Sequence, residues 1–305
     1  MKCLVGKTGF VGSNLWSTGV FDCGYSSKDI EKAYGLQPDL LVYAGVRAEK
    51  YLANRDAELD WQQVSTALDN IRAIAPQKLV LISTVDVYPD PQNVDEDAMI
   101  DMDVLQPYGR NRRRLEEGVQ KLYPKALIVR LPALYGKNLK KNFIYDMMTL
   151  IPHMLHESKF QDLAERSALI RQSYTRQSNG FYVCTVDEQK RADLKEILQQ
   201  MGFTALNFTD SRSVYQFYPL KFLWQHVETA LKKNITILNL ATEPVQAGEL
   251  YHFLHGDTFT NEVSSCPAHY DYRTKYTELY HGKDGYIFDK KTIMEDIRTF
   301  VEADE

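Results

Sequence analysis

The sequence has little cysteine and no long apolar run. Its four cysteines stand far apart and form no Cys-x-x-Cys pair, so we expect neither a disulfide framework nor a zinc site. A reduced, cytoplasmic protein is the simplest interpretation. No stretch of about 18 apolar residues occurs, which argues against a membrane-spanning helix. The first residues, MKCLVGKTGF, also lack an apolar segment followed by a cleavage site, so we expect no signal peptide.

An excess of basic charge is absent as well. The 305 residues carry 36 Lys and Arg against 41 Asp and Glu, a formal net charge of −5. A mildly acidic chain has no electrostatic attraction to nucleic acid or to an anionic membrane. The composition is otherwise that of a globular protein with one large domain or two coupled domains. We therefore expect a small-molecule ligand, with neither a nucleic-acid nor a membrane partner.

Buried strands alternate with helices along the first half of the chain. Short apolar runs predict strands at Lys2–Val5, Val20–Tyr25, Leu40–Gly45, Lys78–Ser83 and Leu127–Leu131. Between them, helices are predicted at Val11–Trp16, Asp29–Tyr34, Asp56–Ile74 and Tyr108–Leu122. This alternation is typical of βαβ units. It predicts an α/β fold with a doubly wound parallel sheet (Rossmann) that is covered by helices on both faces.

The pattern changes after about residue 150. The stretch Ser167–Asp210 predicts a strand, a helix at Asp187–Met201 and a second strand. Further on, Phe217–Leu231 is predicted as a helix, and Thr236–Leu240 as a buried strand that rejoins the first sheet.

We expect two parts that share a cleft, because no Pro/Gly/Ser-rich linker separates them. The dinucleotide-binding Rossmann domain would take residues 1–150 plus about 211–243. A smaller α/β substrate-binding lobe would take about 151–210 and 244–305. The substrate should lie at the carboxyl edge of the sheet.

A glycine-rich turn joins the first strand to the first helix. Its glycines are spaced as GxxGxxG rather than as GxGxxG. Glycines at such a junction allow a tight turn, and they let backbone N–H groups approach a pyrophosphate. A structural turn would also need glycine, but the position at the first strand–helix junction favours dinucleotide binding. The residues predicted at the cofactor here are Gly6, Thr8, Gly9, Phe10, Val11 and Gly12.

Hydroxyl groups are predicted near the carboxyl edge of the sheet. Thr84 follows a buried strand, and Tyr108 begins a charged helix. Arg112 lies one turn after Tyr108 on the same helix face, so we expect its charge to lower the phenol pKa from about 10. Taken alone, Tyr108 would be an ordinary amphipathic contact and Arg112 a solvated charge. With the glycine turn, the set indicates an acid–base site.

These residues resemble the extended short-chain dehydrogenase/reductases, the NAD(P)-dependent epimerase/dehydratase family that acts largely on nucleotide sugars. The glycine turn matches the family's TGxxGxxG, with Val5 where Thr is usual. Thr84 stands four residues before Tyr88, as in the S-x-x-V-Y segment, and Tyr108 matches the YxxxK tyrosine. The resemblance implies that Thr84, Tyr108 and Arg112 are catalytic.

The resemblance also implies further cofactor and substrate contacts. Ala44-Gly45 matches the small residues after the family's fourth strand, and residues 130–136 match its R-x-P-x-x-Y-G stretch. The cofactor-binding residues implied in this way are Asp29, Ile30, Ala44, Gly45, Ser83, Tyr108, Arg112, Leu131, Pro132 and Leu134. The substrate contacts implied are Thr84, Asp86, Asn142 and Arg212.

The chain departs from the family at three places. The YxxxK lysine is Arg112, which keeps the charge but cannot deprotonate, so cofactor binding is a firmer expectation than catalysis. Asp86 comes one place later than the acid pair of the 4,6-dehydratases, on the opposite face of a strand, which argues against dehydration. The segment of about 155–210 is also longer than usual.

The cofactor preference is read from the end of the second strand. Asp22 is poorly placed to bind a ribose 2′-hydroxyl, as NAD would require. Ser26, Ser27 and Lys28 would tolerate a 2′-phosphate, which favours NADP slightly over NAD, although a solvated loop would have the same composition. Two histidine pairs, 153/156 and 252/255, lie at helical spacing but lack further ligands, so no metal is expected.

We expect an NAD(P)-dependent oxidoreductase or epimerase acting on a nucleotide-activated sugar, by keto reduction or epimerisation. One alternative is an NAD(P)-binding sensor or scaffold of the same fold with impaired catalysis, which the replacement at Arg112 motivates. A reductase of a non-sugar carbonyl compound is another. The resemblance also implies a homodimer, formed through the helices predicted at Asp56–Ile74 and Tyr108–Leu122.

Overall fold

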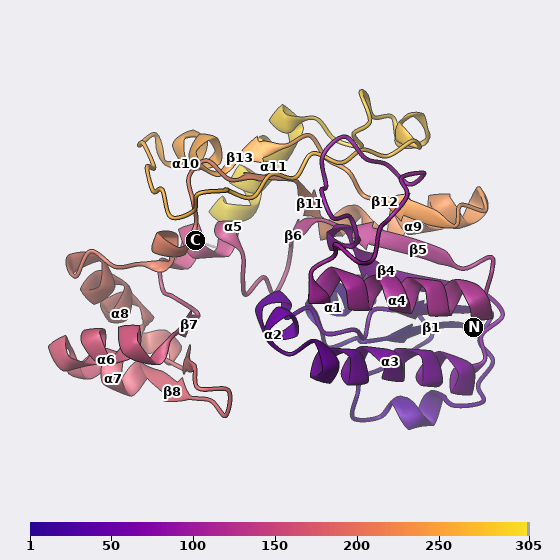
Figure 1. Cartoon of the computed structure of the whole chain (residues 1–305), viewed down its shortest axis with the longest axis horizontal. Helices are drawn as coiled ribbons and strands as arrows, with labels where there is room; N and C mark the ends of the chain where they lie inside the picture. The colour runs from indigo at the N-terminus through magenta and orange to yellow at the C-terminus, as the bar shows by residue number, and fades with distance from the viewer. Residues whose placement is uncertain (304–305) are drawn as a thin grey trace. The chain divides into compact units, whose positions relative to one another are not determined.

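The computed structural model describes residues 1–303, which form two compact units (Figure 1). The first unit comprises Met1–Asn138, Val214–Val245 and His269–Ala303. The second comprises Leu139–Ser213 and Gln246–Ala268. Each unit has a hydrophobic core of its own.

A six-stranded parallel sheet forms the middle of the first unit. Its order is β12-β5-β4-β3-β1-β2, and its hydrogen-bonded neighbours run parallel. The strands are β1 (Lys2–Val5), β2 (Cys23–Tyr25), β3 (Leu40–Tyr43), β4 (Leu79–Thr84), β5 (Leu127–Leu131) and β12 (Ile237–Asn239). The order reverses between β1 and β3, which is where open parallel sheets bind ligands. The predicted doubly wound sheet is confirmed, including the return of its late strand.

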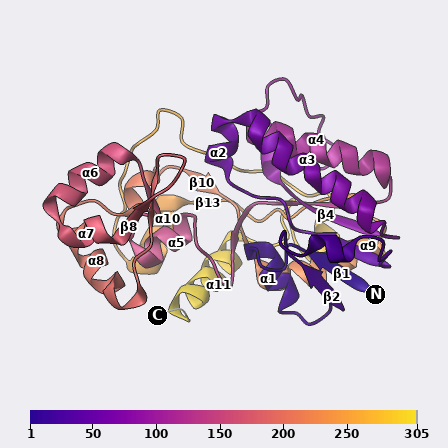
Figure 2. The same ribbon diagram turned by 90° about the horizontal axis from the view of Figure 1, so that it is seen from below.

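Alternate side chains of the strands pack against helices on opposite faces of the sheet. On β1, Leu4 joins one core, while Cys3 and Val5 join the other. The first core includes side chains of α1 (Phe10–Trp16) and α9 (Leu223–Lys232). The second includes side chains of α3 (Ala57–Ile74) and α4 (Pro107–Leu122), which lie side by side (Figures 1 and 2). Burial on both faces explains the continuous apolar runs of these strands.

Shorter elements complete the first unit. They are η1 (Ile30–Ala33), α2 (Lys50–Arg55), η2 (Val85–Val87), β6 (Ala133–Tyr135), β10 (Val214–Tyr215), β11 (Phe217–Pro219), η4 (Leu220–Phe222), η5 (Thr277–Tyr280) and α11 (Lys290–Glu302). The helix predicted over Phe217–Leu231 is wrong in its first turns. There the chain forms β11, which pairs in parallel with β6, and Pro219 cannot donate a helical hydrogen bond. The helix α9 starts only at Leu223.

The second unit contains a small antiparallel sheet of order β7-β9-β8. Its elements are α5 (Phe143–Thr149), β7 (Met154–Leu155), α6 (Glu157–Arg166), α7 (Ala168–Ser173), β8 (Tyr174–Arg176), β9 (Tyr182–Cys184), α8 (Glu188–Gln200), η3 (Ala205–Phe208) and α10 (Ala247–His255). The helix predicted at Asp187–Met201 is confirmed as α8, and the Asp187 carboxylate caps it. The strand predicted from Ser167 is wrong, because the Ser167 side chain caps α7 instead.

The segment His269–Ala303 lies with the first unit, whereas the expected boundaries assigned all of 244–305 to the second lobe. Burial is the physical reason. Tyr272 is fully buried in a cluster with Val85 and Val87. The carboxylate of Glu96 accepts hydrogen bonds from the Thr274 hydroxyl (2.7 Å) and from the Lys275 N–H (2.9 Å).

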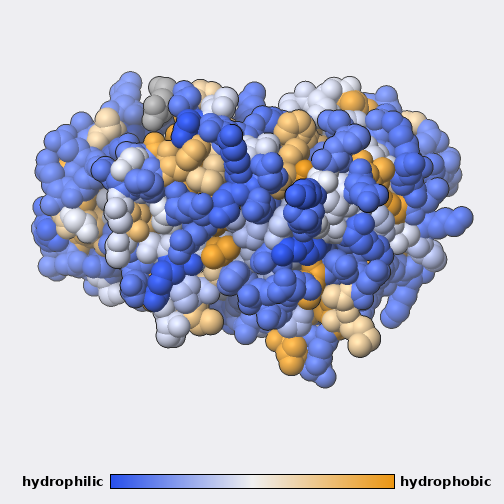
Figure 3. Space-filling model, turned by 90° about the horizontal axis from the view of Figure 1, so that it is seen from above, coloured by the Kyte–Doolittle hydropathy of each residue, from blue (hydrophilic) through white to orange (hydrophobic). Residues whose placement is uncertain are grey.

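Among residues 1–303, no helix has the length and apolar content that crossing a membrane requires. Hydrophilic residues cover most of the face shown in Figure 3, with smaller hydrophobic patches between them.

Candidate active site

The glycine turn between β1 and α1 depends on close backbone contacts. Gly6 has a φ of +92°, and a Cβ atom there would lie 2.5 Å from the Ala44 carbonyl oxygen. A Cβ atom at Gly12 would lie 1.9 Å from the Gly6 carbonyl oxygen. Both distances are too short for any side chain. The predicted neighbours of the turn, Ala44 and Gly45, therefore do lie against it, at the point where the strand order reverses.

The other residues predicted at this turn occupy its continuation. Thr8 lies within the turn, and Phe10 and Val11 are the first two residues of α1. This arrangement fits a dinucleotide, because the absence of side chains leaves the backbone N–H groups at the start of α1 accessible to a pyrophosphate.

The segment after β2 is ordered by Asp29. Its carboxylate accepts hydrogen bonds from both the N–H and the hydroxyl of Ser26, each at 2.7 Å. These bonds hold the pKa of Asp29 below its ordinary value. Ser27 and Lys28 follow directly after β2 and Ser26, as predicted, and Ile30 begins η1. The Ser26 hydroxyl is thus engaged within its own turn.

Thr84 and Tyr108 lie together at the carboxyl end of β4. The Thr84 hydroxyl lies close enough to the Tyr108 hydroxyl to lower its pKa, and it caps η2 by accepting from the Asp86 N–H (3.2 Å). The Tyr108 N–H, at the start of α4, donates to the Asn54 side chain of α2 (2.9 Å). Tyr108 is only 6% exposed. Two hydroxyls distant in sequence are therefore held at the edge where ligands bind in this fold.

Arg112 lies beneath the ring of Tyr108, as the helical spacing predicted. Its guanidinium carbon is 4.0 Å from the ring centroid. The guanidinium donates to Asp60 of α3 at 2.5 Å and to the carbonyl of Arg47. Arg112 is 3% exposed, so it forms a buried ion pair with Asp60, and its guanidinium packs against the tyrosine ring. Asp60 and the Arg47 carbonyl thus occupy the guanidinium of a residue that the resemblance places at the cofactor.

The expected effect of Arg112 on Tyr108 is present but is outweighed. Burial raises the pKa of the Tyr108 phenol, and Asp86 raises it further. Arg112, Lys50 and the Thr84 hydroxyl act in the opposite direction. The net pKa lies above the ordinary value, so the prediction of a lowered pKa is wrong for the protein without ligand. Burial was not visible in the helical spacing that suggested the lowering.

A charged cluster beside Tyr108 was not predicted. Lys50 of α2 donates to Asp86 (2.7 Å) and to the Tyr270 hydroxyl (3.0 Å), and Tyr270 donates to Asp86 (2.8 Å). Asp86 lies in η2 rather than on the opposite face of a strand, because the chain turns directly after Thr84. Lys50 and Tyr270 carry no local sequence signal, since 220 residues separate them.

The remaining predicted residues of the first unit surround β5. The Ser83 hydroxyl donates to the fully buried Glu116 carboxylate at 2.6 Å. Leu131 ends β5, Pro132 follows it, and Leu134 lies in β6. The Ser83 side chain is thus directed into a buried polar network, and the cofactor contacts expected of these four residues stay predictions.

Both residues predicted from the resemblance in the second unit already have partners there. The Asn142 side chain caps α5 by accepting from the Tyr145 N–H (3.2 Å). Arg212 makes two hydrogen bonds to Asp210, at 2.9 and 2.8 Å, and pairs with Glu262 at 2.9 Å. Arg212 holds the pKa of Asp210 well below its ordinary value. A diphosphate at Arg212 would have to compete with two carboxylates.

The histidine pair 153/156 is not on one helix, which corrects that prediction. His153 precedes β7, and His156 is the residue just before α6. Within residues 1–303, no cluster of three potential metal ligands is found.

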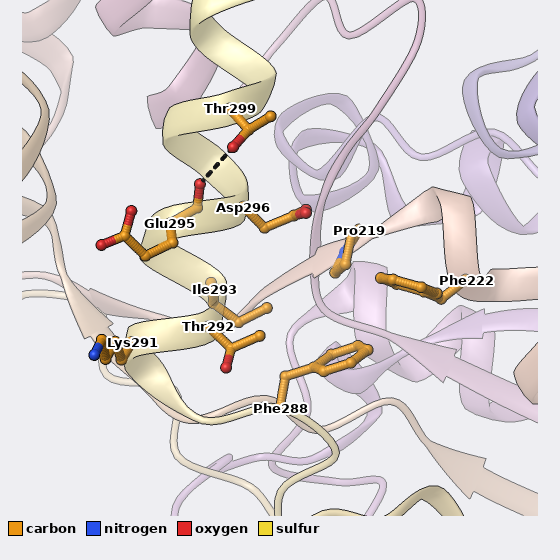
Figure 4. A pocket seen from close by; sticks show the side chains of 9 residues that line it. All are labelled: Pro219, Phe222, Phe288, Lys291, Thr292, Ile293, Glu295, Asp296 and Thr299. Carbon is orange, nitrogen blue, oxygen red and sulfur yellow. Dashed lines mark hydrogen bonds between the residues drawn. The ribbon is translucent and has the colours of Figure 1, made fainter.

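A pocket in the first unit lies between α11 and the β11–η4 segment (Figure 4). Phe222 and Phe288 give it an apolar wall, and Asp296 gives it a polar one. Asp296 accepts from the Tyr135 hydroxyl (2.8 Å) and pairs with Lys221. None of the residues predicted for the active site lines this pocket.

The fold and the site together define a Rossmann-type α/β protein with a hydroxyl pair at the carboxyl edge of its sheet. Residues 26–165 match the model of the NAD dependent epimerase/dehydratase family. This match covers a little under half of the chain, and it agrees with the family resemblance that the motifs carry. No curated protein matches the chain by sequence.

Solved structures of similar fold cover the whole chain. The dTDP-4-dehydrorhamnose reductase of Clostridium acetobutylicum is 13% identical with a TM-score of 0.63, covering 99% of both chains. The Bacillus anthracis reductase of the same name, in complex with NADP, is 14% identical with a TM-score of 0.61, covering 99% of this chain and 97% of its own. The UDP-N-acetylglucosamine 4-epimerase of Methanobrevibacter ruminantium is 10% identical with a TM-score of 0.63, covering 99% of this chain and 96% of its own. At these identities the likeness shows the fold.

Proposed function

We propose that the protein transfers hydride between a nicotinamide cofactor and a nucleotide-activated sugar, as a keto reductase or an epimerase. The observation that carries this proposal is the pairing of the Thr84 and Tyr108 hydroxyls at the carboxyl end of β4, in a sheet whose strand order reverses between β1 and β3. Reductases and 4-epimerases of nucleotide sugars are among the proteins of similar fold, which supports this class of substrate.

The residues of the chain have separate tasks in this proposal. The Tyr108 hydroxyl exchanges a proton with a sugar hydroxyl or carbonyl oxygen. The Thr84 hydroxyl hydrogen-bonds the same oxygen and stabilises its developing charge. Arg112 holds the Tyr108 ring from below through Asp60. The nicotinamide, when bound, gives or takes the hydride.

The glycine turn would hold the pyrophosphate, and the segment after β2 would contact the adenosine ribose. We retain the slight preference for NADP, because Ser27 and Lys28 follow the strand end while the Asp29 carboxylate is bonded to Ser26. Asn142 and Arg212 stay proposed substrate contacts of the second unit. A homodimer through α3 and α4 also stays a proposal, to be tested by light scattering.

The sensor or scaffold with impaired catalysis remains a second candidate. The observation that favours it is the engagement of the Arg112 guanidinium by Asp60 and by the Arg47 carbonyl. With these partners, Arg112 would contribute little to holding a ribose.

One set of assays separates the two candidates. The first step is to denature the purified protein and identify any released nucleotide by mass spectrometry. Turnover is then followed with NADPH and a dTDP-4-dehydro sugar, and with UDP-N-acetylglucosamine. Tyr108→Phe should abolish turnover and keep cofactor binding, while Tyr123→Phe, at the other end of α4, should match the parent. Parental turnover in Tyr108→Phe would refute the assigned roles, and cofactor binding without turnover in the parent would favour the sensor.

A further inference from the structure

The helix α2 presents one face to the start of α4. Lys50 and Asn54 are one turn apart and therefore share that face. The Asn54 side chain accepts a hydrogen bond from the Tyr108 N–H at 2.9 Å, so the face that carries Lys50 is directed towards Tyr108. From this face, the Lys50 ammonium donates to Asp86 at 2.7 Å and to Tyr270 at 3.0 Å.

The partner of Lys50 adjoins Tyr108 as well. The Asp86 carbonyl lies so close to α4 that a Cβ atom on Gly109 would be 2.0 Å from its oxygen. The Asp86 N–H donates to the Thr84 hydroxyl at 3.2 Å, and that hydroxyl acts in turn on the Tyr108 hydroxyl. The two residues of the Lys50–Asp86 pair are thus held next to the first turn of α4, which carries the proposed proton donor.

Four elements contribute charged or polar groups that act on the pKa of the Tyr108 hydroxyl. These groups are Arg112 from α4, Lys50 from α2, Asp86 from η2 and the Thr84 hydroxyl from β4. Behind them, Asp60 neutralises Arg112 and Tyr270 bonds to Lys50. Lys50 and Arg112 lower the pKa of the phenol and Asp86 raises it, against the larger effect of burial.

The two cations differ in how accessible they are to a ligand. Arg112 is buried, stacked on the ring and paired with Asp60, so its position is fixed. The side chain of Lys50 is 49% exposed and that of Asp86 is 20% exposed. A group entering the site can reach Lys50 and Asp86 directly.

We propose that Lys50 is a positioning residue whose ammonium sets the acidity of the Tyr108 hydroxyl, with Asp86 and Tyr270 fixing where that charge stands. This inference rests on the proposed function, in which Tyr108 donates a proton to the substrate oxygen and is left as a tyrosinate beside Lys50. It follows that neutralising Lys50 and neutralising Asp86 must have opposite effects on Tyr108.

The experiment is a titration of Tyr108 in the full-length protein. The protein is labelled with 3-fluorotyrosine, and the Tyr108 resonance is assigned in ¹⁹F NMR spectra by its loss in Tyr108→Phe. Lys50→Met should move the titration midpoint up by about one pH unit, and Asp86→Asn should move it down by a similar amount. Lys50→Arg, which keeps the charge, should stay close to the parent.

Lys121→Met is the matched control. Lys121 lies on α4 like Tyr108, but roughly 20 Å further along the helix. That separation exceeds the screening length of about 10 Å at 0.1 M salt, so the midpoint should not move.

An unchanged midpoint in both Lys50→Met and Asp86→Asn would overturn the proposal, as would shifts in the same direction. If Lys50→Met does not fold, Lys50→Gln and Asp86→Asn test the same statement. The titration needs no substrate. Opposite shifts in a protein that transfers no hydride would therefore refute the proposed function and leave the role of Lys50 standing. Hydride transfer in a protein whose midpoints do not shift would support the proposed function and refute the role of Lys50.

Discussion

Replacing Gly12 with alanine tests whether the turn between β1 and α1 depends on backbone contact. A Cβ atom at Gly12 would lie 1.9 Å from the Gly6 carbonyl oxygen and 2.6 Å from its carbonyl carbon. The start of α1 would have to move away by about 1.5 Å to restore an ordinary contact of 3.4 Å. Such overpacking costs about 1–3 kcal/mol. For a domain of this size, Gly12→Ala should lower the thermal midpoint by roughly 2–12 °C.

Gly9→Ala is the matched partner in the same turn. A Cβ atom at Gly9 would meet its nearest neighbour, the Gly6 carbonyl oxygen, at 3.4 Å, which is ordinary contact. Gly9 also has a φ of −77°, which alanine adopts without strain. The free energy of unfolding should therefore change by less than about 0.5 kcal/mol. The added methyl group would stand where a pyrophosphate approaches the backbone, so NADPH should bind about tenfold more weakly or worse.

Circular dichroism gives the thermal midpoints, and calorimetric titration with NADPH and NADH gives the affinities. A parental midpoint in Gly12→Ala would refute the packing argument. Parental affinity in Gly9→Ala would show that the pyrophosphate does not lie against this turn, whatever the stability of the variant.

Two further substitutions test the electrostatics. Arg112→Met would leave the carboxylate of Asp60, whose side chain is 11% exposed, without its ion-pair partner. Urea unfolding should then show a free energy of unfolding lower by about 3–5 kcal/mol, and adding Asp60→Leu should recover part of this loss. Little loss in the single variant would show that the pair is effectively solvated. Burial raises the pKa of Asp146 to about 7, so its contribution to stability is present below about pH 4 and is lost as the pH rises through 7. Asp146→Asn should therefore raise the free energy of unfolding at pH 8, by a few kcal/mol at most, and leave it unchanged near pH 4. The exposed Asp162→Asn should have no effect at either pH, and an equal gain at both would contradict the assigned cause.

Much of the sheet could be predicted from the sequence because its strands are buried on both faces. The strands at Lys2–Val5 and Leu127–Leu131 begin and end as predicted. Prediction failed where tertiary pairing decides the conformation. Phe217–Pro219 has the apolar content of a helix but pairs with β6 as a strand. The burial of Tyr272 among residues nearly 200 positions earlier has no local signal at all.

The candidate site divides in the same way. Thr84 and Tyr108 could be predicted because each follows from a local pattern, a strand end and a helix start. Lys50 and Tyr270 could not, since the fold alone brings them to Asp86. The direction of the Tyr108 pKa was wrong for a related reason: helical spacing reveals the neighbouring charge of Arg112, whereas burial depends on every element packed around the ring.

The place of Tyr272 in the first unit has a consequence for biosynthesis. A ribosome releases η2, with Asp86, long before it adds the residues around Tyr272 that pack against η2. At about 5–20 residues per second, this interval lasts roughly 10–40 s. During that time the nascent chain would have β1 to β5 but an uncovered apolar surface at Val85 and Val87. The proposed active site is therefore among the last parts of the first unit to be completed, and a chain stalled before residue 270 would be a natural target for chaperones.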